Sequence, residues 1–188
     1  MNKEKEYRLT LKKIFKHFSV INKHRFKVFC LCCKVGIPFQ GIFHDFTKYY
    51  PVEFCESARY YTDGKYSPIK NCKKEKGYSN AWIHHKNHNK HHYEYWYDYS
   101  APIESPIMPF NYFLELVCDS FAAGIIYQGK NWHQGYQLEY WKRAKEKAKM
   151  HPKMVKLIEK VYIEESINGL NKVLRRKYLK ELYDEYTK

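Results

Sequence analysis

The chain has 188 residues, of which 44% are hydrophobic and 18% aromatic, and its formal net charge is +14. The aromatic and aliphatic content excludes an intrinsically disordered chain, and the length suits one domain with a substantial core. Only eight glycines and seven prolines occur, which disfavours a loop-rich β architecture.

The basic excess lies at the two ends of the sequence. Residues 1–35 carry ten Lys and Arg against two acidic residues, and residues 141–188 carry fourteen against seven, whereas residues 36–140 are close to neutral. Basic flanks favour a polyanion as partner: a nucleotide, nucleic acid or an anionic membrane. A lysine-rich solvated helix surface explains the same charge without any partner.

The segments that would direct the chain to a membrane or out of the cell are not visible. No apolar stretch follows the charged N-terminus, and the longest apolar run, residues 28–33, is too short to cross a bilayer. We therefore expect a cytoplasmic protein whose six cysteines are reduced thiols.

Most of the sequence has helical periodicity, and no strand pattern stands out. The segments with this periodicity are residues 7–18, 22–35, 40–49, 51–61, a helix from residue 80 onward, about 110–127, 134–149, 152–165 and 167–186. Loops are expected over residues 62–78 and 98–109, where Gly, Pro and charged residues gather. The prediction is an all-α fold, a single helical domain over residues 1–188 with about seven to eight helices and basic C-terminal helices over 134–188.

Two predicted helices place polar residues on or beside an apolar stripe. His24 lies four residues before Val28 on the stripe of the segment 22–35, so its imidazole needs a buried partner. The segment 110–127 has an apolar stripe for the core, while Glu115 and Asp119 share another face.

Six of the ten histidines lie in two short pieces of sequence. One piece contains the doublet His44-Asp45, and the other, residues 81–94, contains five histidines within nine residues. Imidazole is the commonest metal ligand in proteins, so this density favours a metal site.

Two histidines and two aspartates are predicted to lie on three different helices: His24, His44, Asp45 and Asp119. Helical domains build metal sites from inward-pointing ligands on several helices. A mixed His and Asp set suits Mn, Fe, Zn, Co or Ni, with Mg possible, rather than copper(I) or an iron–sulfur cluster.

The same residues resemble a known pattern. A histidine on an early helix, a His-Asp doublet twenty residues later and a distant aspartate on a later helix resemble the HD-domain superfamily of metal-dependent phosphohydrolases. The chain is more closely similar to the DUF5662 family, over roughly residues 20–145. The motifs that carry this resemblance are His44-Asp45-Phe46-Thr47-Lys48, Ala81-Trp82-Ile83-His84-His85, Asn89-Lys90-His91-His92 and Cys118-Asp119.

The resemblance implies an HD-like bundle with its metal-site core over residues 20–127. It implies His24, His44, Asp45 and Asp119 as ligands of a first divalent ion, and His85, His91 and His92 as ligands of a second. His84 and His88 are alternate ligands for the second ion. The residues expected to contact substrate are Lys48, His84, His88 and Asn89. Both faces of one continuous helix cannot point into one site, so a break at Asn89 is needed for the last two histidines to turn inward independently.

The implied function is hydrolysis of a nucleotide or other phosphate ester by metal-activated water. Asp45 would bridge the ions, Lys48 would compensate charge on a phosphoryl oxygen, and Glu94 and Glu115 would orient ligating histidines. Two alternatives stay open: a non-catalytic, metal-stabilised protein that binds nucleic acid or another partner, and a di-iron oxygenase on the HD fold.

The remaining candidates favour structural roles. Cys30 and Cys33 have a zinc-like spacing without a second cysteine pair. The isolated His17, His133 and His151 are expected to be ordinary histidines. The aromatic run 93–97 suits core packing better than base stacking.

Overall fold

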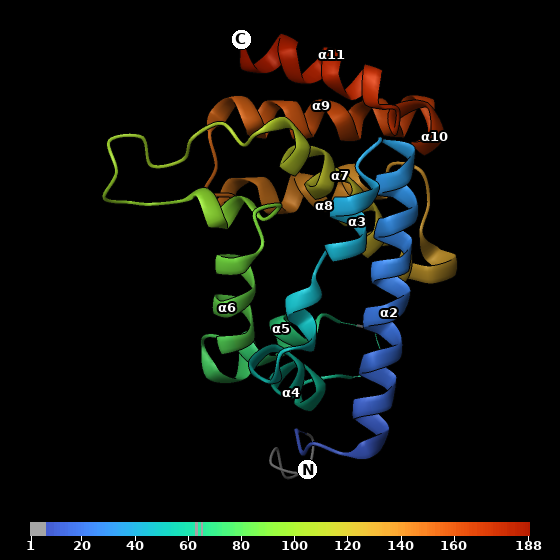
Figure 1. The fold of residues 1–188 in the computed structure, drawn as a ribbon, viewed down its shortest axis with the longest axis vertical. Helices are drawn as coiled ribbons and strands as arrows, with labels where there is room; N and C mark the ends of the chain where they lie inside the picture. Colours follow the sequence, from blue (N-terminus) through green and yellow to red (C-terminus); the bar gives the residue numbers. More distant parts are fainter. Residues whose placement is uncertain (1–6, 63, 65) are drawn as a thin grey trace.

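The computed structural model describes residues 7–62, 64 and 66–188, and the fold of these residues is all-α, as predicted (Figure 1). The described chain contains ten α-helices, four short 3₁₀ helices and no strand. The α-helices are α2 (Leu11–Lys34), α3 (Pro38–Phe43), α4 (Pro51–Arg59), α5 (Pro68–Lys76), α6 (Asn80–His88), α7 (Phe110–Gln128), α8 (Tyr136–Ala144), α9 (Pro152–Asn168), α10 (Leu170–Val173) and α11 (Arg176–Thr187). The 3₁₀ helices are η1 (Phe46–Tyr49), η2 (Tyr93–Trp96), η3 (Gly129–Asn131) and η4 (Lys145–Lys147).

The first helix differs from the prediction. Residues 7–18 and 22–35 were expected to form two helices, but α2 is one continuous helix of 24 residues. Thr10 begins it, because the Thr10 hydroxyl accepts a hydrogen bond from the Lys13 amide. The segment between the two expected helices contains no Gly or Pro, and the buried Ile21 continues the inward stripe, so nothing interrupts the helix.

The predicted helix over residues 40–49 is also wrong, because the chain breaks at the His-Asp doublet. Helix α3 ends at Phe43, and Asp45 adopts a left-handed conformation with φ 54°. It is the one non-glycine residue with positive φ in the described part of the chain. Aspartate tolerates this region better than most residues, and its cost is typical of functional positions.

Two further segments were predicted incorrectly. The expected loop 62–78 contains α5, which starts at Pro68, buries Cys72 and ends at the left-handed Gly77. The expected helix 167–186 is interrupted at Gly169, which ends α9 with φ 79°. The connector 98–109, in contrast, has no helix, as predicted.

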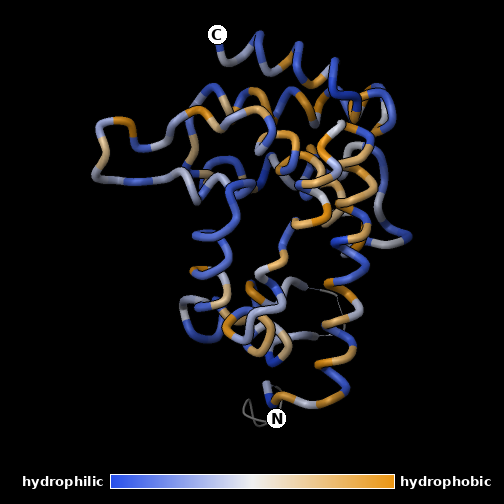
Figure 2. The backbone as a smooth tube through the Cα atoms, viewed as in Figure 1, coloured by the Kyte–Doolittle hydropathy of each residue, from blue (hydrophilic) through white to orange (hydrophobic). Residues whose placement is uncertain are grey.

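The hydrophobic core lies at one end of the molecule, where α7, α8, α9 and α11 pack with the C-terminal half of α2. Figure 1 shows α9 and α11 above α7, with α2 running along one edge towards the N-terminal end, where α4, α5 and α6 lie. The predicted stripe of α7 is confirmed, since Phe113, Leu114, Val117 and Phe121 are fully buried. The α6 tube is mainly hydrophilic in Figure 2, so polar contacts must hold it in place. No helix in the described residues is long and apolar enough to cross a membrane.

Candidate metal centre

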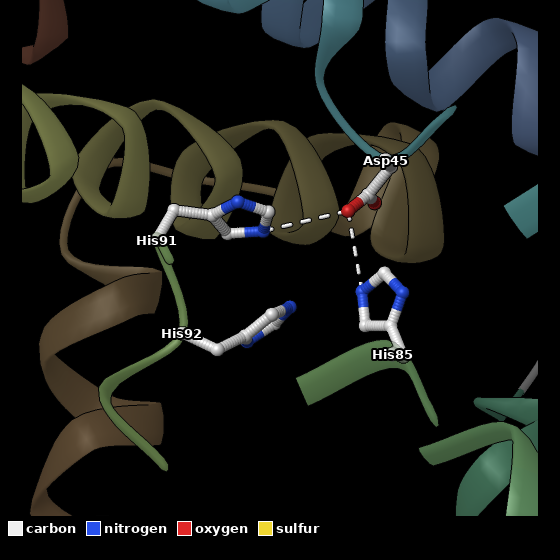
Figure 3. Close-up of side chains that lie close together, drawn as sticks. All are labelled: Asp45, His85, His91 and His92. Carbon is white, nitrogen blue, oxygen red and sulfur yellow. Dashed lines mark ion pairs between the residues drawn. The ribbon is translucent and has the colours of Figure 1, made fainter. Parts of the chain in front are cut away.

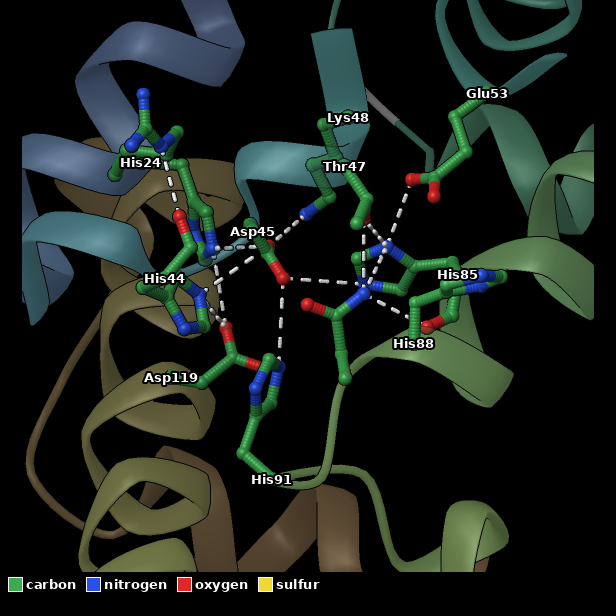
Figure 4. A network of polar contacts seen from close by, with 12 residues as sticks. His24, His44, Asp45, Thr47, Lys48, Glu53, His85, His88, His91 and Asp119 are labelled. Atoms are coloured by element: carbon green, nitrogen blue, oxygen red, sulfur yellow. Dashed lines mark hydrogen bonds and ion pairs between the residues drawn. The ribbon is translucent and has the colours of Figure 1, made fainter. Parts of the chain in front are cut away.

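Asp45 lies at the centre of a buried polar cluster between α2, α7 and the break after α3 (Figure 4). Its Oδ2 atom is 3.6 Å from His24 Nε2 and 3.2 Å from His44 Nε2. Asp119 Oδ1, on α7, is 3.1 Å from His24 Nε2 and 3.7 Å from His44 Nε2. These four residues offer ligand atoms that all lie within 4.8 Å of one another, and we call them the first subsite.

A second set of donors faces the other oxygen of Asp45 (Figure 3). Asp45 Oδ1 is 3.2 Å from His85 Nε2 and 3.4 Å from His91 Nε2. His92 completes a set whose ligand atoms also lie within 4.8 Å of one another. We call Asp45, His85, His91 and His92 the second subsite.

The end of α6 explains how histidines from both of its predicted faces reach one site. Ser79 caps the start of α6 by accepting a hydrogen bond from the Trp82 amide. The helix ends at His88, and Asn89 is extended, so the chain after Asn89 turns back towards Asp45. The Asn89 amide donates to Thr47 Oγ1 at 2.9 Å and to the His85 carbonyl at 2.7 Å. These bonds fix the turn beside the segment that carries Asp45.

Glu115 contacts one histidine of each subsite, on the side of the ring that faces away from Asp45. One of its oxygens, Oε1, accepts from His44 Nδ1 at 2.9 Å and from His91 Nδ1 at 3.1 Å. Gln40 donates to the other oxygen at 2.9 Å. An ionised carboxylate is only an acceptor, so both Nδ1 atoms carry a proton, and both Nε2 atoms are left to face Asp45, where each could ligate a cation once its own proton is displaced.

Glu53, on α4, orients histidines of α6 in the same way, by accepting hydrogen bonds from their Nδ1 atoms. The buried carboxylate accepts from His85 Nδ1 at 2.8 Å and from His84 Nδ1 at 2.6 Å. Nε2 of His85 is therefore the nitrogen that faces Asp45 and is available as a ligand. His84, in contrast, is directed at Glu53, and the exposed His88 stacks on it with ring centroids 4.1 Å apart, so His84 and His88 lie outside both subsites.

Burial and charge compete in the cluster. Burial opposes ionisation of Asp45, but the positive charges of His44 and Lys48 hold its pKa well below the ordinary value. Burial likewise disfavours the His44 imidazolium, and the neighbouring Asp45 charge and carboxylate hydrogen bonds raise the pKa of His44 well above 6.5. Hydrogen bonds from His44 and His91 outweigh burial and lower the pKa of Glu115 to about 2. Protons thus balance the carboxylates in the ion-free protein, and a divalent cation would compete with them.

The donor atoms fit bound cations better than they fit one another. The N–O separations within the two subsites are 3.1 to 3.7 Å, and several converging atoms are buried without a hydrogen bond in the described structure. These atoms are His24 Nε2, His44 Nε2, both carboxylate oxygens of Asp45, His91 Nε2 and His92 Nε2. Burial, with the charges of His91 and His85, keeps the pKa of His92 well below its ordinary value, so its ring stays a neutral donor. Apart from Asp45 Oδ2, which also pairs with Lys48, such buried polar atoms are costly unless an ion binds them, and the clusters could hold a metal ion.

Lys48 forms an ion pair with Asp45 Oδ2 from the first turn after the break. Burial opposes its charge, but Asp45 and Asp119 raise the pKa of the Lys48 ammonium. Its side chain is 27% exposed, whereas that of Asp45 is 1% exposed, so Lys48 lies between the buried carboxylate and the surface.

Sequence patterns did not reveal two residues that support the site, Glu53 and Arg25, and they predicted a supporting role for a third residue, Glu94. Glu53 belongs to no motif that the sequence shows. The sequence indicated only that it lies in the first turn of the helix expected to begin at Pro51. Arg25 donates to the His44 carbonyl at 2.8 Å, which fixes the break from α2. Glu94, expected to orient a histidine, forms no hydrogen bond with a subsite histidine in the described residues, and burial raises its pKa.

The weaker candidates lie outside both subsites, and Cys33, expected to be a structural thiol, is exposed. His17 is buried against the rings of Phe54 and Tyr61. His133 pairs with Glu139 in solvent, and His151 caps α9. All six cysteines are free thiols, and the aromatic run contributes Tyr93 and Trp96 to the edge of the core.

Comparison with known proteins gives one match. A family model described as a family of unknown function, DUF5662, matches residues 13–164 and so includes every residue of both subsites. No curated protein and no solved structure matches the chain.

Proposed function

We propose that this chain, which belongs to the DUF5662 family, is a metal-dependent phosphohydrolase or phosphodiesterase that acts on a nucleotide or another phosphate ester. In this proposal the two subsites hold two divalent transition-metal ions. The reaction takes place at the Asp45 carboxylate, as in the HD-domain superfamily that the sequence resembles.

One observation carries the proposal: the two oxygens of Asp45 face different ligand sets. Oδ2 lies beside His24 and His44, and Oδ1 lies beside His85 and His91. A structural metal site needs one closed set of four ligands, whereas paired sites with a shared carboxylate are typical of phosphoryl-transfer enzymes.

The chain's own groups define the chemistry around that carboxylate. Divalent ions held there supply polarisation of a phosphoryl oxygen and a lowered pKa for water. Asp45 keeps the two ions adjacent, and its buried left-handed backbone fixes the direction of its carboxylate. The Lys48 ammonium places positive charge beside that carboxylate, where it would stabilise negative charge on the equatorial oxygens of the phosphate. The basic ends of the chain would attract an anionic substrate.

The test is metal analysis of untagged protein, followed by turnover assays with Mn, Fe, Co, Ni, Zn or Mg added. The substrates are nucleoside phosphates, cyclic dinucleotides and an aryl phosphodiester. Two bound ions per chain, with metal-dependent release of phosphate or of a nucleotide, would support the proposal. Lys48→Ala should lower turnover while the metal content is retained.

Other outcomes would identify the alternatives. One tightly held ion with no turnover of any phosphate ester would favour a structural metal in a binding protein. Two iron atoms with oxygen consumption would favour an oxygenase, because the same mixed His and carboxylate donors also suit iron.

A further inference from the structure

Large apolar side chains on α2 and α3 are exposed at the surface and are not buried in the core. Exposed fractions are 70% for Phe15, 68% for Phe26, 77% for Phe39 and 69% for Phe43. Surfaces of this kind mark interaction sites when the apolar residues are contiguous. We call this surface the α2–α3 face, and its main apolar side chains are Leu11, Phe15, Phe18, Phe26, Phe39 and Phe43.

The exposed apolar residues of α2 form a second stripe, beside the stripe that enters the core. Leu11, Phe15 and Phe18 are spaced four and three residues apart, and Phe26 continues the row two turns later. The inward residues His17 and Ile21 lie on another side of the helix from Phe15, whereas Phe18 lies at the border between the two stripes and contacts Phe54. Packing within the chain therefore does not explain the exposure of Phe15 and Phe26.

The stripe continues across the break that carries the metal ligands. The Phe18 ring lies 6.0 Å from the Tyr49 ring, and the Tyr49 ring lies 5.8 Å from that of Phe46. The Arg25 guanidinium covers both η1 rings, at 5.6 Å from Phe46 and 5.0 Å from Tyr49. The exposed stripe of α2 therefore continues onto η1, the segment that follows the buried Asp45.

A row of lysines runs beside the stripe. Lys12, Lys23 and Lys27 lie on the next face of α2 and form no ion pair with an acidic residue of the described chain. The 24 residues of α2 contain no Asp or Glu at all. Figure 2 shows the resulting alternation of hydrophobic and hydrophilic residues along this helix.

This charge pattern distinguishes between possible occupants. A second copy of the chain, docked through the same face, would bring two lysine rows together with no acidic residue on either helix. A bilayer that contains anionic lipid offers phosphates for the lysines and an apolar boundary for the phenylalanines, and helices with this combination lie in the membrane interface.

We propose that the α2–α3 face docks the protein on an anionic lipid surface. The phenylalanines enter the headgroup boundary, and the α2 lysines contact lipid phosphates. The proposal does not depend on the phosphohydrolase activity, since it rests on residues outside both subsites.

The experiment is co-sedimentation of the full chain with vesicles of mixed phosphatidylglycerol and phosphatidylcholine, and with vesicles of phosphatidylcholine alone. We expect binding to the anionic vesicles only, weakened by salt at about 0.15 M and above. Two lysine-to-glutamate changes, Lys12→Glu with Lys23→Glu, should reduce the partition coefficient by about tenfold or more. Phe15→Ser with Phe26→Ser should also reduce it, and both double variants should keep the melting temperature of the wild type because these side chains are exposed.

Matched controls separate the face from general hydrophobicity and charge. Ile167→Ser removes a side chain that is 69% exposed, the same fraction as Phe43, from a helix on another side of the core, and it should not affect binding. Lys142→Glu with Lys147→Glu makes the same charge change on α8 and η4 and should have a small effect.

Three results would overturn the proposal: no binding to anionic vesicles, equal binding to neutral ones, or equal loss from the control variants. A wild-type dimer in light scattering that Phe15→Ser with Phe26→Ser converts to a monomer would also overturn it. That result would assign the face to a second copy.

Discussion

The two subsites share Asp45 but are built on different supports. His24 lies within the 24-residue α2 and Asp119 within the 19-residue α7, and both helices enter the main core. His85 lies on the nine-residue α6, and His91 and His92 lie in the irregular turn after it. Long helices packed in a core hold ligands more rigidly than short polar elements do. We therefore expect the first subsite to bind its ion more tightly and to fill first.

The largest expected effect comes from the one residue common to both subsites. Asp45→Asn should remove both ions and lower any turnover by several orders of magnitude, because a neutral amide cannot balance two cations. Asparagine also tolerates the left-handed backbone, so the fold should survive. The measurement is metal content per chain after dialysis, with circular dichroism as the check on folding. Asp98→Asn, at an exposed aspartate, is the control, and an Asp45→Asn protein with full metal content would remove Asp45 from the site.

The next prediction tests each subsite separately by removing one ligand from it. His85→Gln should lower the metal content by about one equivalent and leave the first ion bound, because it removes a donor from the second subsite alone. His24→Gln should weaken the first ion instead. Titration calorimetry with Mn or Zn on metal-free protein measures both. His133→Gln, at an exposed histidine, should bind like the wild type. Equal losses from His24→Gln and His85→Gln would show that the cluster holds one shared ion.

The sequence indicated the directions of His24 and Asp119 more directly than those of His91 and His92, for a physical reason. Helical periodicity put His24 and Asp119 on regular helices, where a residue's direction follows from its number. The inward turn of His91 and His92 depends on where α6 stops, and Asn89 gave only a conditional signal for that.

Two supports of the site had no local signal at all. The left-handed backbone of Asp45 results from contacts such as the Arg25 bond to the His44 carbonyl, which joins residues 19 apart. Glu53 approaches α6 through tertiary packing, 32 residues before His85. Burial and pairing of this kind depend on the whole fold, so periodicity does not reveal them.

A smaller effect is expected at the carboxylate behind both subsites. Glu115→Gln removes the charge that fixes the Nδ1 protons of His44 and His91 while it keeps the shape of the side chain. Loss of such a supporting carboxylate typically weakens metal affinity by about 10 to 100-fold. Because Glu115 contacts one histidine of each subsite, both affinities should fall together. Glu139→Gln breaks an exposed carboxylate–histidine pair and should change neither affinity. A change in one subsite only would contradict the shared role.

The smallest effect on the metal centre is expected from His17, which is buried on the same helix as His24 but packs against aromatic rings rather than carboxylates. Burial, aided by the charge of Lys48, lowers the pKa of His17 to about 4. The unfolded chain binds this proton below pH 6.5, and the folded chain resists it until about pH 4, so the free energy of unfolding should fall as the pH decreases through that window. A shift of this size corresponds to at most about 3 kcal/mol. His17→Phe should flatten this part of the stability curve, measured by urea denaturation of metal-free protein, and leave metal affinity unchanged. A parallel loss of bound metal would mean that the N-terminal half of α2 positions His24 as strongly as the core does. The difference in rigidity between the two subsites would then need another cause.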